Sequence, residues 1–179
     1  LTGAQARAWA EIAADLSQPY PMQRLLQGDV GSGKTVVAAL ACLRAVEAGY
    51  QAAFMAPTEI LAEQHAKKLT PLFESLGLAC AWISGSQRKT QRTAAWQAVA
   101  DGKADIVFGT HALFQEGGRF RQLGLVVVDE QHRFGVGQRL ALMEKGREPH
   151  QLMMSATLIP RTLAMSFFAD LDVSTIDAL

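Results

Sequence analysis

The sequence predicts an α/β fold in which helices cover both faces of a mainly parallel central sheet. Short, mostly continuous apolar runs recur along the 179 residues, as expected for strands that are covered on both faces. Helical patterns lie between most of these runs, and this alternation implies right-handed strand–helix–strand connections. Together the two observations predict three layers, with the sheet in the middle.

The elements follow one another at regular intervals. A helix is expected from Thr2 to about Asp15, because Thr2 followed by Gln5 forms a capping box, and Pro19 and Pro21 then indicate a short loop. The expected strands are residues 22–27, 52–56, 78–83, 105–108, 125–128 and 152–155. Further helices are expected at 36–48, 59–76 and 87–100, ending at or near Gly49, Gly77 and Gly102, where glycine is favoured. No internal repeat or domain boundary is apparent, so residues 1–179 are expected to form one domain.

Composition excludes the disordered and fibrous classes of protein. A hydrophobic content of 49% is ample for a buried core, and 17 basic residues balance 17 acidic ones, so any nucleic-acid contact must be local. Cys42 and Cys80 lie in apolar runs, which favours free buried thiols over a disulfide or metal site and fits a reducing, cytoplasmic setting. No apolar run approaches the ~20 residues that span a bilayer. The chain begins without Met, and we expect it to be a piece of a longer protein.

Residues 28–35 read GDVGSGKT and match the phosphate-binding pattern G-x-x-x-x-G-K-[ST] between an expected strand and an expected helix. In such a loop the backbone N–H groups and the helix N-terminus converge on an anion. Lys34 would reach the β- and γ-phosphates of ATP, and the Thr35 hydroxyl would take one site on Mg²⁺. The expected nucleotide-binding residues of this loop are Gly28, Asp29, Val30, Gly31, Ser32, Gly33, Lys34 and Thr35.

Two carboxylates follow the apolar run 125–128. Asp129 would hold Mg²⁺ and Glu130 would orient the water that attacks the γ-phosphorus, while Gln131 and His132 would sense the γ-phosphate. The alternative for the acidic pair is a helix N-terminus, where the dipole favours carboxylates. His132 could equally be a surface or hydrogen-bonded histidine without a ligand.

The order of these motifs resembles that of superfamily 2 helicases. Three further segments fit that scheme: 56–59 (APTE) resembles motif Ia, 109–111 (GTH) motif Ib and 155–157 (SAT) motif III. The phrases PTEILAEQH, GTHALFQ, DEQHRFGVGQRLAL and IPRTLAMSFFADLD are similar to the RecG family of DNA branch-migration helicases. The transcription-repair coupling factor shares HRFGV and IPRTL and is the alternative.

The resemblance implies the first of two RecA-like P-loop NTPase motor domains, which couples ATP hydrolysis to translocation on duplex DNA and to branch migration or fork regression. It gives Gln5 a role in adenine recognition, although the capping box explains the same residue. Pro57, Thr58, Gly109 and Thr110 would contact DNA phosphates, with helix capping as the alternative for the threonines.

Ser155 and Thr157 would couple the acidic residues to the DNA side, with a polar strand end as the alternative. The family commonly has Pro where this chain has Leu158, which frees the turn before Pro160 but should not affect phosphate chemistry. The basic cluster of Arg88, Lys89 and Arg92 is interpreted as a solvated helix face.

The resemblance also implies partners: a second RecA-like domain with catalytic arginines, an N-terminal wedge domain, and branched duplex DNA such as forks or Holliday junctions. We therefore expect the chain to bind ATP but to hydrolyse it poorly alone. Two other classes remain open. A P-loop kinase would need an arginine-bearing lid, which is not evident, and a non-catalytic nucleotide-gated module would not need both Lys34 and Glu130.

Overall fold

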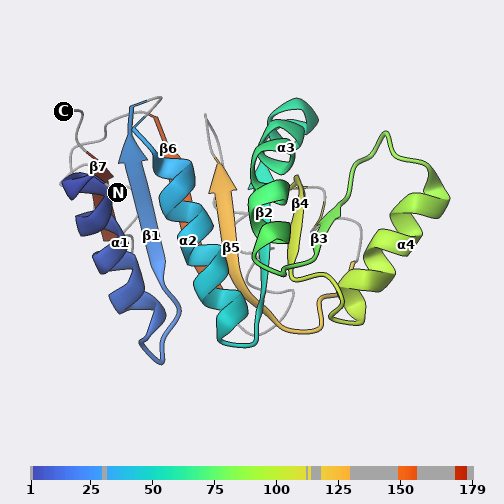
Figure 1. Cartoon of the computed structure of the whole chain (residues 1–179), viewed down its shortest axis with the longest axis horizontal. Coiled ribbons are helices and arrows are strands. Elements are labelled where there is room, and N and C mark those ends of the chain that lie inside the picture. Colours follow the sequence, from blue (N-terminus) through green and yellow to red (C-terminus); the bar gives the residue numbers. More distant parts are fainter. Residues whose placement is uncertain are drawn as a thin grey trace.

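The computed structural model (Figure 1) describes residues 2–29, 32–111, 113, 118–129, 149–156 and 172–176. The helices in this part of the chain are α1 (Gly3–Leu16), α2 (Lys34–Glu47), α3 (Glu59–Ser75) and α4 (Lys89–Ala100). The strands are β1 (Gln23–Gly28), β2 (Gln51–Ala56), β3 (Cys80–Trp82), β4 (Ile106–Thr110), β5 (Leu123–Asp129), β6 (His150–Ser155) and β7 (Asp172–Ile176).

These strands form one sheet in the order β3-β4-β2-β5-β6-β1-β7. Every neighbouring pair is parallel. The carboxyl ends of the strands therefore lie along one edge of the sheet, which is the upper edge in Figure 1. The predicted parallel sheet is confirmed.

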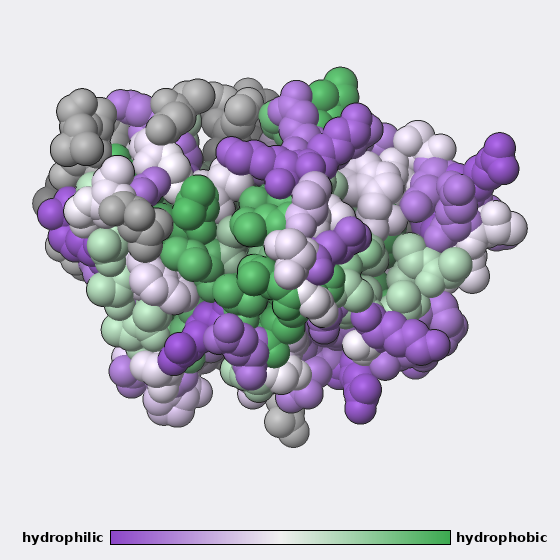
Figure 2. All heavy atoms as spheres, viewed as in Figure 1, coloured by the Kyte–Doolittle hydropathy of each residue, from purple (hydrophilic) through white to green (hydrophobic). Residues whose placement is uncertain are grey.

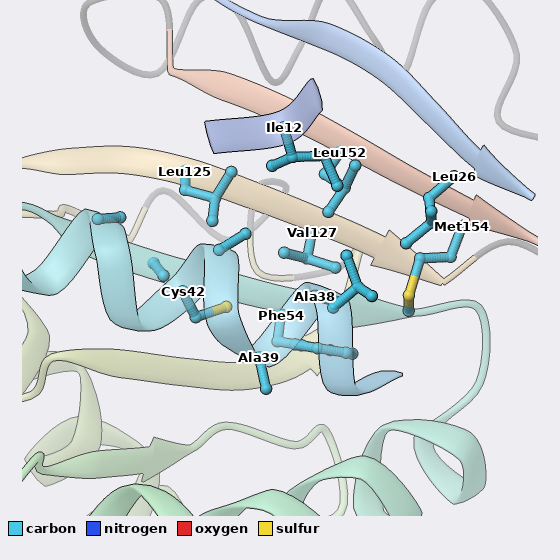
Figure 3. Close-up of a cluster of buried hydrophobic side chains, with 14 of the residues drawn as sticks. Ile12, Leu26, Ala38, Ala39, Cys42, Phe54, Leu125, Val127, Leu152 and Met154 are labelled. Carbon is cyan, nitrogen blue, oxygen red and sulfur yellow. The ribbon is translucent and has the colours of Figure 1, made fainter. Parts of the chain in front are cut away.

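Two apolar cores lie on opposite faces of the sheet. Successive residues of a strand point to opposite faces, so Leu125 and Val127 enter one core while Val126 and Val128 enter the other. The first core is covered by α1, α2 and α3, and Figure 3 shows Ile12, Ala38 and Cys42 directed at Leu125, Val127 and Leu152. The second core is covered by α4 through Val99, together with Ala104 and Leu113. The predicted three-layer arrangement is confirmed.

The helix boundaries follow the predicted signals. The capping box at α1 is present, since Thr2 Oγ1 accepts from the N–H of Gln5 and Gln5 Oε1 accepts from the N–H of Thr2. Gly49, Gly77 and Gly102 follow α2, α3 and α4 and all have positive φ. These three glycines end the helices as the sequence indicates.

Strand β7 is not among the predicted strands. It pairs with β1 at the edge of the sheet and is held partly by polar contacts. The buried Arg24 guanidinium donates to Ser174 Oγ at 2.9 Å and pairs with Asp15 of α1 at 2.8 Å, while Gln27 Nε2 donates to Thr175 Oγ1. Because Ser174 and Thr175 interrupt the apolar residues of DVSTI, β7 lacks the continuous run by which the other strands were identified.

The surface of the α1–α3 face is uneven. Figure 2 shows hydrophobic residues gathered over the middle of α2 and hydrophilic residues over the upper end of α3.

Cys42 and Cys80 are free thiols, as predicted, and burial raises the pKa of Cys42 to about 12 and that of Cys80 to about 11. None of the described helices is long and apolar enough to cross a membrane.

Candidate functional site

The described parts of the predicted site meet at the carboxyl edge of the sheet. Strands β4, β2, β5, β6 and β1 lie side by side in that order, and their last residues are Thr110, Ala56, Asp129, Ser155 and Gly28. Each predicted motif begins within one residue of one of these ends. The parallel sheet therefore brings together segments from widely separated parts of the sequence, as expected for a ligand site in an open α/β sheet.

The loop after β1 leads directly into α2. Gly33 is the N-cap of α2, with φ of 88°, and makes no side-chain cap for the helix. The first N–H groups of a helix have no partner within it, so the start of α2 offers donors and a positive dipole end. Ser32 N–H donates to Asp29 O at 3.0 Å, which closes the turn before the helix. Val30 and Gly31 lie outside the described residues.

Lys34 is folded back over this loop. Its ammonium donates to the carbonyl of Gly28 at 2.5 Å and to that of Asp29 at 3.1 Å. Partial burial lowers the pKa of Lys34, and the negative charges of Asp129 and Asp29 partly offset that effect. The ammonium thus lies within the field of Asp129, the carboxylate at the end of β5. Thr35 follows in the first turn of α2 and is partly buried.

Gly28 and Ser32 approach each other closely. A Cβ atom on Gly28 would come within 2.6 Å of Ser32 Oγ and 3.0 Å of the Ile176 carbonyl, so a larger residue would displace the loop. Ser32 Oγ is itself buried, and in the described part of the chain it has no hydrogen-bond partner. Burying a hydroxyl without a hydrogen-bond partner costs free energy. A polar group bound in this loop would supply the missing partner.

Gln5 links helix α1 to the same loop. Besides its two capping contacts, its Nε2 donates to the carbonyl of Ser32 at 3.2 Å. A Cβ on Gly33 would stand only 1.7 Å from Gln5 Nε2. The capping prediction for Gln5 is confirmed, and the expected adenine contact remains a prediction.

Asp129 has a partner that the sequence analysis did not identify. Asp129 Oδ2 lies 2.5 Å from Nε2 of His65 in α3, and the His65 ring packs on Phe54 of β2 with centroids 4.8 Å apart. The phrase PTEILAEQH contains His65, but no role follows from the phrase alone. The sequence does contain one signal for His65, which is its helical spacing. Ala62, Leu69 and Phe73 form the buried stripe of α3, and His65 falls on the same stripe.

The predicted DNA-contacting residues lie on two neighbouring strands. Ala56 is opposite Thr110 in the β2–β4 register, so Pro57 and Thr58 emerge beside Gly109 and Thr110. Thr58 caps α3, with Oγ1 accepting from Leu61 N–H at 3.2 Å, so its capping role is confirmed. A contact between Thr58 and DNA remains a prediction.

The loop after β3 is tied to the same region. Glu59 at the start of α3 accepts from the Gly85 N–H at 2.7 Å, and this hydrogen bond lowers the pKa of Glu59, with a further contribution from Ser84. The β3–α4 loop therefore stands next to the first turn of α3. Arg88 and Lys89 beyond it are exposed, in keeping with the solvated face that was predicted, whereas Arg92 of the same cluster is partly buried.

The remaining predicted residues are only partly described. Ser155 ends β6 opposite Gln27 of β1, so it lies close to the start of the phosphate-loop segment. Besides Val30 and Gly31, five predicted residues lie outside the described part of the chain: Glu130, Gln131, His132, Thr157 and Leu158.

A cavity of about 870 Å³ lies at the opposite edge of the sheet, at the amino ends of the strands. Its lining includes Pro21, Tyr50, Leu123 and His150. None of the predicted site residues lines this cavity, and the chemistry proposed for the site does not involve it.

Comparison with known proteins agrees with the sequence motifs. Residues 2–166 match the family of DEAD/DEAH box helicases. The chain is 58% identical over 182 aligned residues to an ATP-dependent DNA helicase RecG of Escherichia coli (strain K12), with 99% of this chain and 26% of that protein covered. A RecG helicase of Bacillus subtilis (strain 168) is 54% identical, with 100% and 26% covered. The chain thus spans about a quarter of the length of these relatives.

Solved structures show the same fold. The structure of RecG bound to a three-way DNA junction matches with a TM-score of 0.88 at 48% identity, covering 100% of this chain and 24% of that one. The UvsW helicase from bacteriophage T4 matches with a TM-score of 0.69 at 18% identity, covering 99% and 60%, which supports the fold alone. The predicted resemblance to RecG and the RecA-like fold class are confirmed.

Proposed function

The chain belongs to the DEAD/DEAH box helicase family, and on that premise we propose that it is the ATP-binding motor domain of a DNA helicase of the RecG type. The observation that carries the proposal is the placement of Lys34 and Asp129. Lys34 begins α2 just after β1, Asp129 ends β5, and both strand ends lie at the same edge of the parallel sheet. The negative charge of Asp129 also partly offsets the lowering of the Lys34 pKa by burial. A cation and a metal-binding carboxylate at this edge are what the phosphates of ATP and Mg²⁺ require.

The described loop fits a phosphate group. The N-terminus of α2 lacks a side-chain cap, the Lys34 ammonium is bound to loop carbonyls, and the buried Ser32 hydroxyl has no partner among the described residues. In the proposed site the N–H groups of the loop and of α2 hold the phosphate oxygens. Lys34 exchanges its contacts with Gly28 and Asp29 for the β- and γ-phosphates.

Mg²⁺ is the proposed metal, held by the Thr35 hydroxyl and Asp129. When bound, it neutralises charge on the transferred phosphoryl group. Both residues offer oxygen, the ligand atom that Mg²⁺ prefers. Glu130 is the proposed residue that orients the attacking water, and Gln131 and His132 are proposed to sense the γ-phosphate. Gln5 is proposed to contact the adenine.

DNA is proposed to run along the same edge of the sheet, past Pro57, Thr58, Gly109 and Thr110. Contacts from such residues hold the phosphate backbone without reading sequence. Ser155 and Thr157 are proposed to couple this track to the acidic residues. The RecG structure matched by this chain holds a three-way DNA junction, which supports branched duplex DNA, such as forks or Holliday junctions, as the substrate here.

The proposed activity of the parent protein is branch migration or fork regression in DNA recombination and repair, in the cytoplasm. A second RecA-like domain and an N-terminal wedge are the proposed additional parts, and the 26% of its relatives that this chain spans leaves room for both. The transcription-repair coupling factor is not favoured, because the relatives described above are RecG helicases.

Replacing Lys34 tests this proposal. We expect Lys34→Ala to weaken binding of a fluorescent ATP analogue by about tenfold or more, because a hydrogen bond to a charged group contributes roughly 1.5–3 kcal/mol. The control is Lys67→Ala, which removes an exposed lysine that pairs with Glu63 on the surface of α3. Equal affinities for the parent chain and Lys34→Ala would reject the loop as the phosphate site.

A further inference from the structure

We infer that His65 positions the carboxylate of Asp129 for metal binding and joins helix α3 to the metal site. His65 Nε2 lies 2.5 Å from Asp129 Oδ2. The inference rests on the proposed function, because Asp129 must be a metal ligand for its orientation to matter.

The chemistry of the contact fixes its direction. An ionised carboxylate only accepts hydrogen bonds, so Nε2 of His65 carries the hydrogen and donates it to Oδ2. The contact restrains rotation of the Asp129 carboxylate and occupies Oδ2, so Oδ1 is the oxygen that we infer binds the metal. Hydrogen bonds to ligating carboxylates orient them for the metal, and their loss commonly lowers metal affinity 10–100-fold.

The imidazole is also held by aromatic packing. Phe54, itself almost fully buried, lies against the His65 ring at 4.8 Å, and Phe54 packs in turn on Phe108 at 5.6 Å. The side chains of His65 and Asp129 are only 15% and 18% exposed. Low exposure strengthens the hydrogen bond, since water competes less for either group.

Packing alone does not explain a histidine at this position. His65 occupies the stripe of α3 formed by the buried Ala62, Leu69 and Phe73. A leucine or methionine would fill that stripe with no polar atoms to satisfy. The polar ring is accounted for by Asp129, which stands at the end of β5, the strand next to β2.

The contact between His65 and Asp129 also connects the proposed DNA contacts with the proposed metal site at this edge of the sheet. Helix α3 begins after its N-cap Thr58, a proposed DNA contact, and His65 is seven residues further on, about 10 Å along the axis. Because α3 is one continuous helix from Glu59 to Ser75, a displacement of its first turn also displaces the donor that holds Asp129. His65 is therefore a positioning residue between the DNA side and the metal carboxylate.

Metal dependence of nucleotide binding tests the inference in this chain. Binding of a fluorescent, non-hydrolysable ATP analogue is measured at increasing Mg²⁺ and also without metal, for the parent chain, His65→Met and His65→Gln. Methionine fills similar space without a donor, whereas the glutamine amide restores one. The matched control is Gln64→Met at the exposed neighbouring position of α3.

We expect His65→Met to raise the Mg²⁺ concentration for half-maximal effect about tenfold or more. Metal-free affinity should stay unchanged, His65→Gln should recover most of the loss, and Gln64→Met should match the parent chain. Should His65→Met fail to fold by circular dichroism, His65→Asn replaces it, because its shorter amide does not reach Asp129.

The outcomes distinguish a failure of the proposed function from a failure of the role inferred for His65. If the parent chain binds no nucleotide, the proposed function fails and the inference fails with it. If the parent chain binds Mg²⁺-nucleotide and the donor-free variant has the same Mg²⁺ dependence, only the role of His65 is overturned. A loss that His65→Gln does not recover also overturns it, since packing would then explain the effect.

Discussion

His150 shows how a single half-buried side chain makes the fold sensitive to pH. Its Nδ1 accepts a hydrogen bond from the N–H of Met22 at 2.7 Å, which requires that nitrogen to be unprotonated. Burial lowers the pKa of His150 from its ordinary value of 6.5, and the charge of Asp15 only partly offsets this effect. The folded chain therefore favours the neutral imidazole more than the unfolded chain does.

The consequence is a loss of stability in acid. A histidine with a lowered pKa in the folded state contributes stability that is present above pH 6.5 and is lost as the pH falls through its folded pKa. We expect the free energy of unfolding in urea to fall more between pH 7.5 and 5.5 for the parent chain than for His150→Asn, whose amide oxygen accepts without titrating. The same pH dependence in both chains would exclude His150 as the cause.

Single residues also show what could be predicted from sequence. GDVGSGKT and the carboxylate after the apolar run 125–128 were identified because their spacing serves phosphate chemistry. The contact between His65 and Asp129 was not predicted, because it joins residues 64 positions apart through the packing of α3 on the sheet. A local pattern carries no information on which helix residue meets a given strand end.

At the level of elements, α1 and α2 meet through Gln5 and Gly33. Gln5 caps α1 and holds the Ser32 carbonyl, while Gly33 has a positive φ and no room for a Cβ. We expect Gly33→Ala to reduce the free energy of unfolding by at least about 1 kcal/mol from backbone strain alone, with the clash against Gln5 adding to it.

A double-mutant cycle measured by urea unfolding separates the two terms. Gln5→Ala alone should cost about 1 kcal/mol through the lost cap. In the Gln5→Ala background, Gly33→Ala should cost less than in the parent chain, because the clash is gone while the strain remains. Strictly additive losses would show that the Gln5 amide does not oppose a side chain at residue 33.

Most helices and strands could be predicted because their own residues indicate where each begins and ends. Thr2, Gly49, Gly77 and Gly102 mark helix ends, and their positions agree with α1 to α4 within a few residues. The strand expected at 78–83 is shorter, spanning only Cys80–Trp82, since it lies at the edge of the sheet with one partner. Strand β7 escaped prediction because polar pairs with Arg24 and Gln27 hold its middle residues.

For the whole molecule, the parallel sheet explains why one edge carries the candidate chemistry. All described strand ends with a predicted motif lie there, and the cavity of about 870 Å³ lies at the other edge. The fold class followed from the alternation of strands and helices. How this chain would meet the second motor domain and the wedge proposed above could not follow from such patterns, since a local pattern carries no information on a surface that another domain would supply.

We propose that this chain is the nucleotide-binding half of a two-part motor. The site proposed here provides Lys34 and Glu130, whereas helicases of this kind take arginines from a second RecA-like domain, and such arginines contribute roughly 10³–10⁵ in rate. A balanced charge of 17 basic and 17 acidic residues also gives the isolated chain no general attraction for DNA.

The most direct test measures ATP hydrolysis, with and without a synthetic DNA fork, by three proteins: residues 1–179, the same chain extended through a second RecA-like domain, and the full-length parent. We expect little ATP turnover by residues 1–179, a rise of orders of magnitude with the second domain, and a preference for forks only in the full-length protein. Glu130→Gln in the full-length protein should remove the activity while keeping nucleotide affinity. Brisk fork-stimulated hydrolysis by residues 1–179 alone would show that the chain is a complete enzyme and not half of a motor.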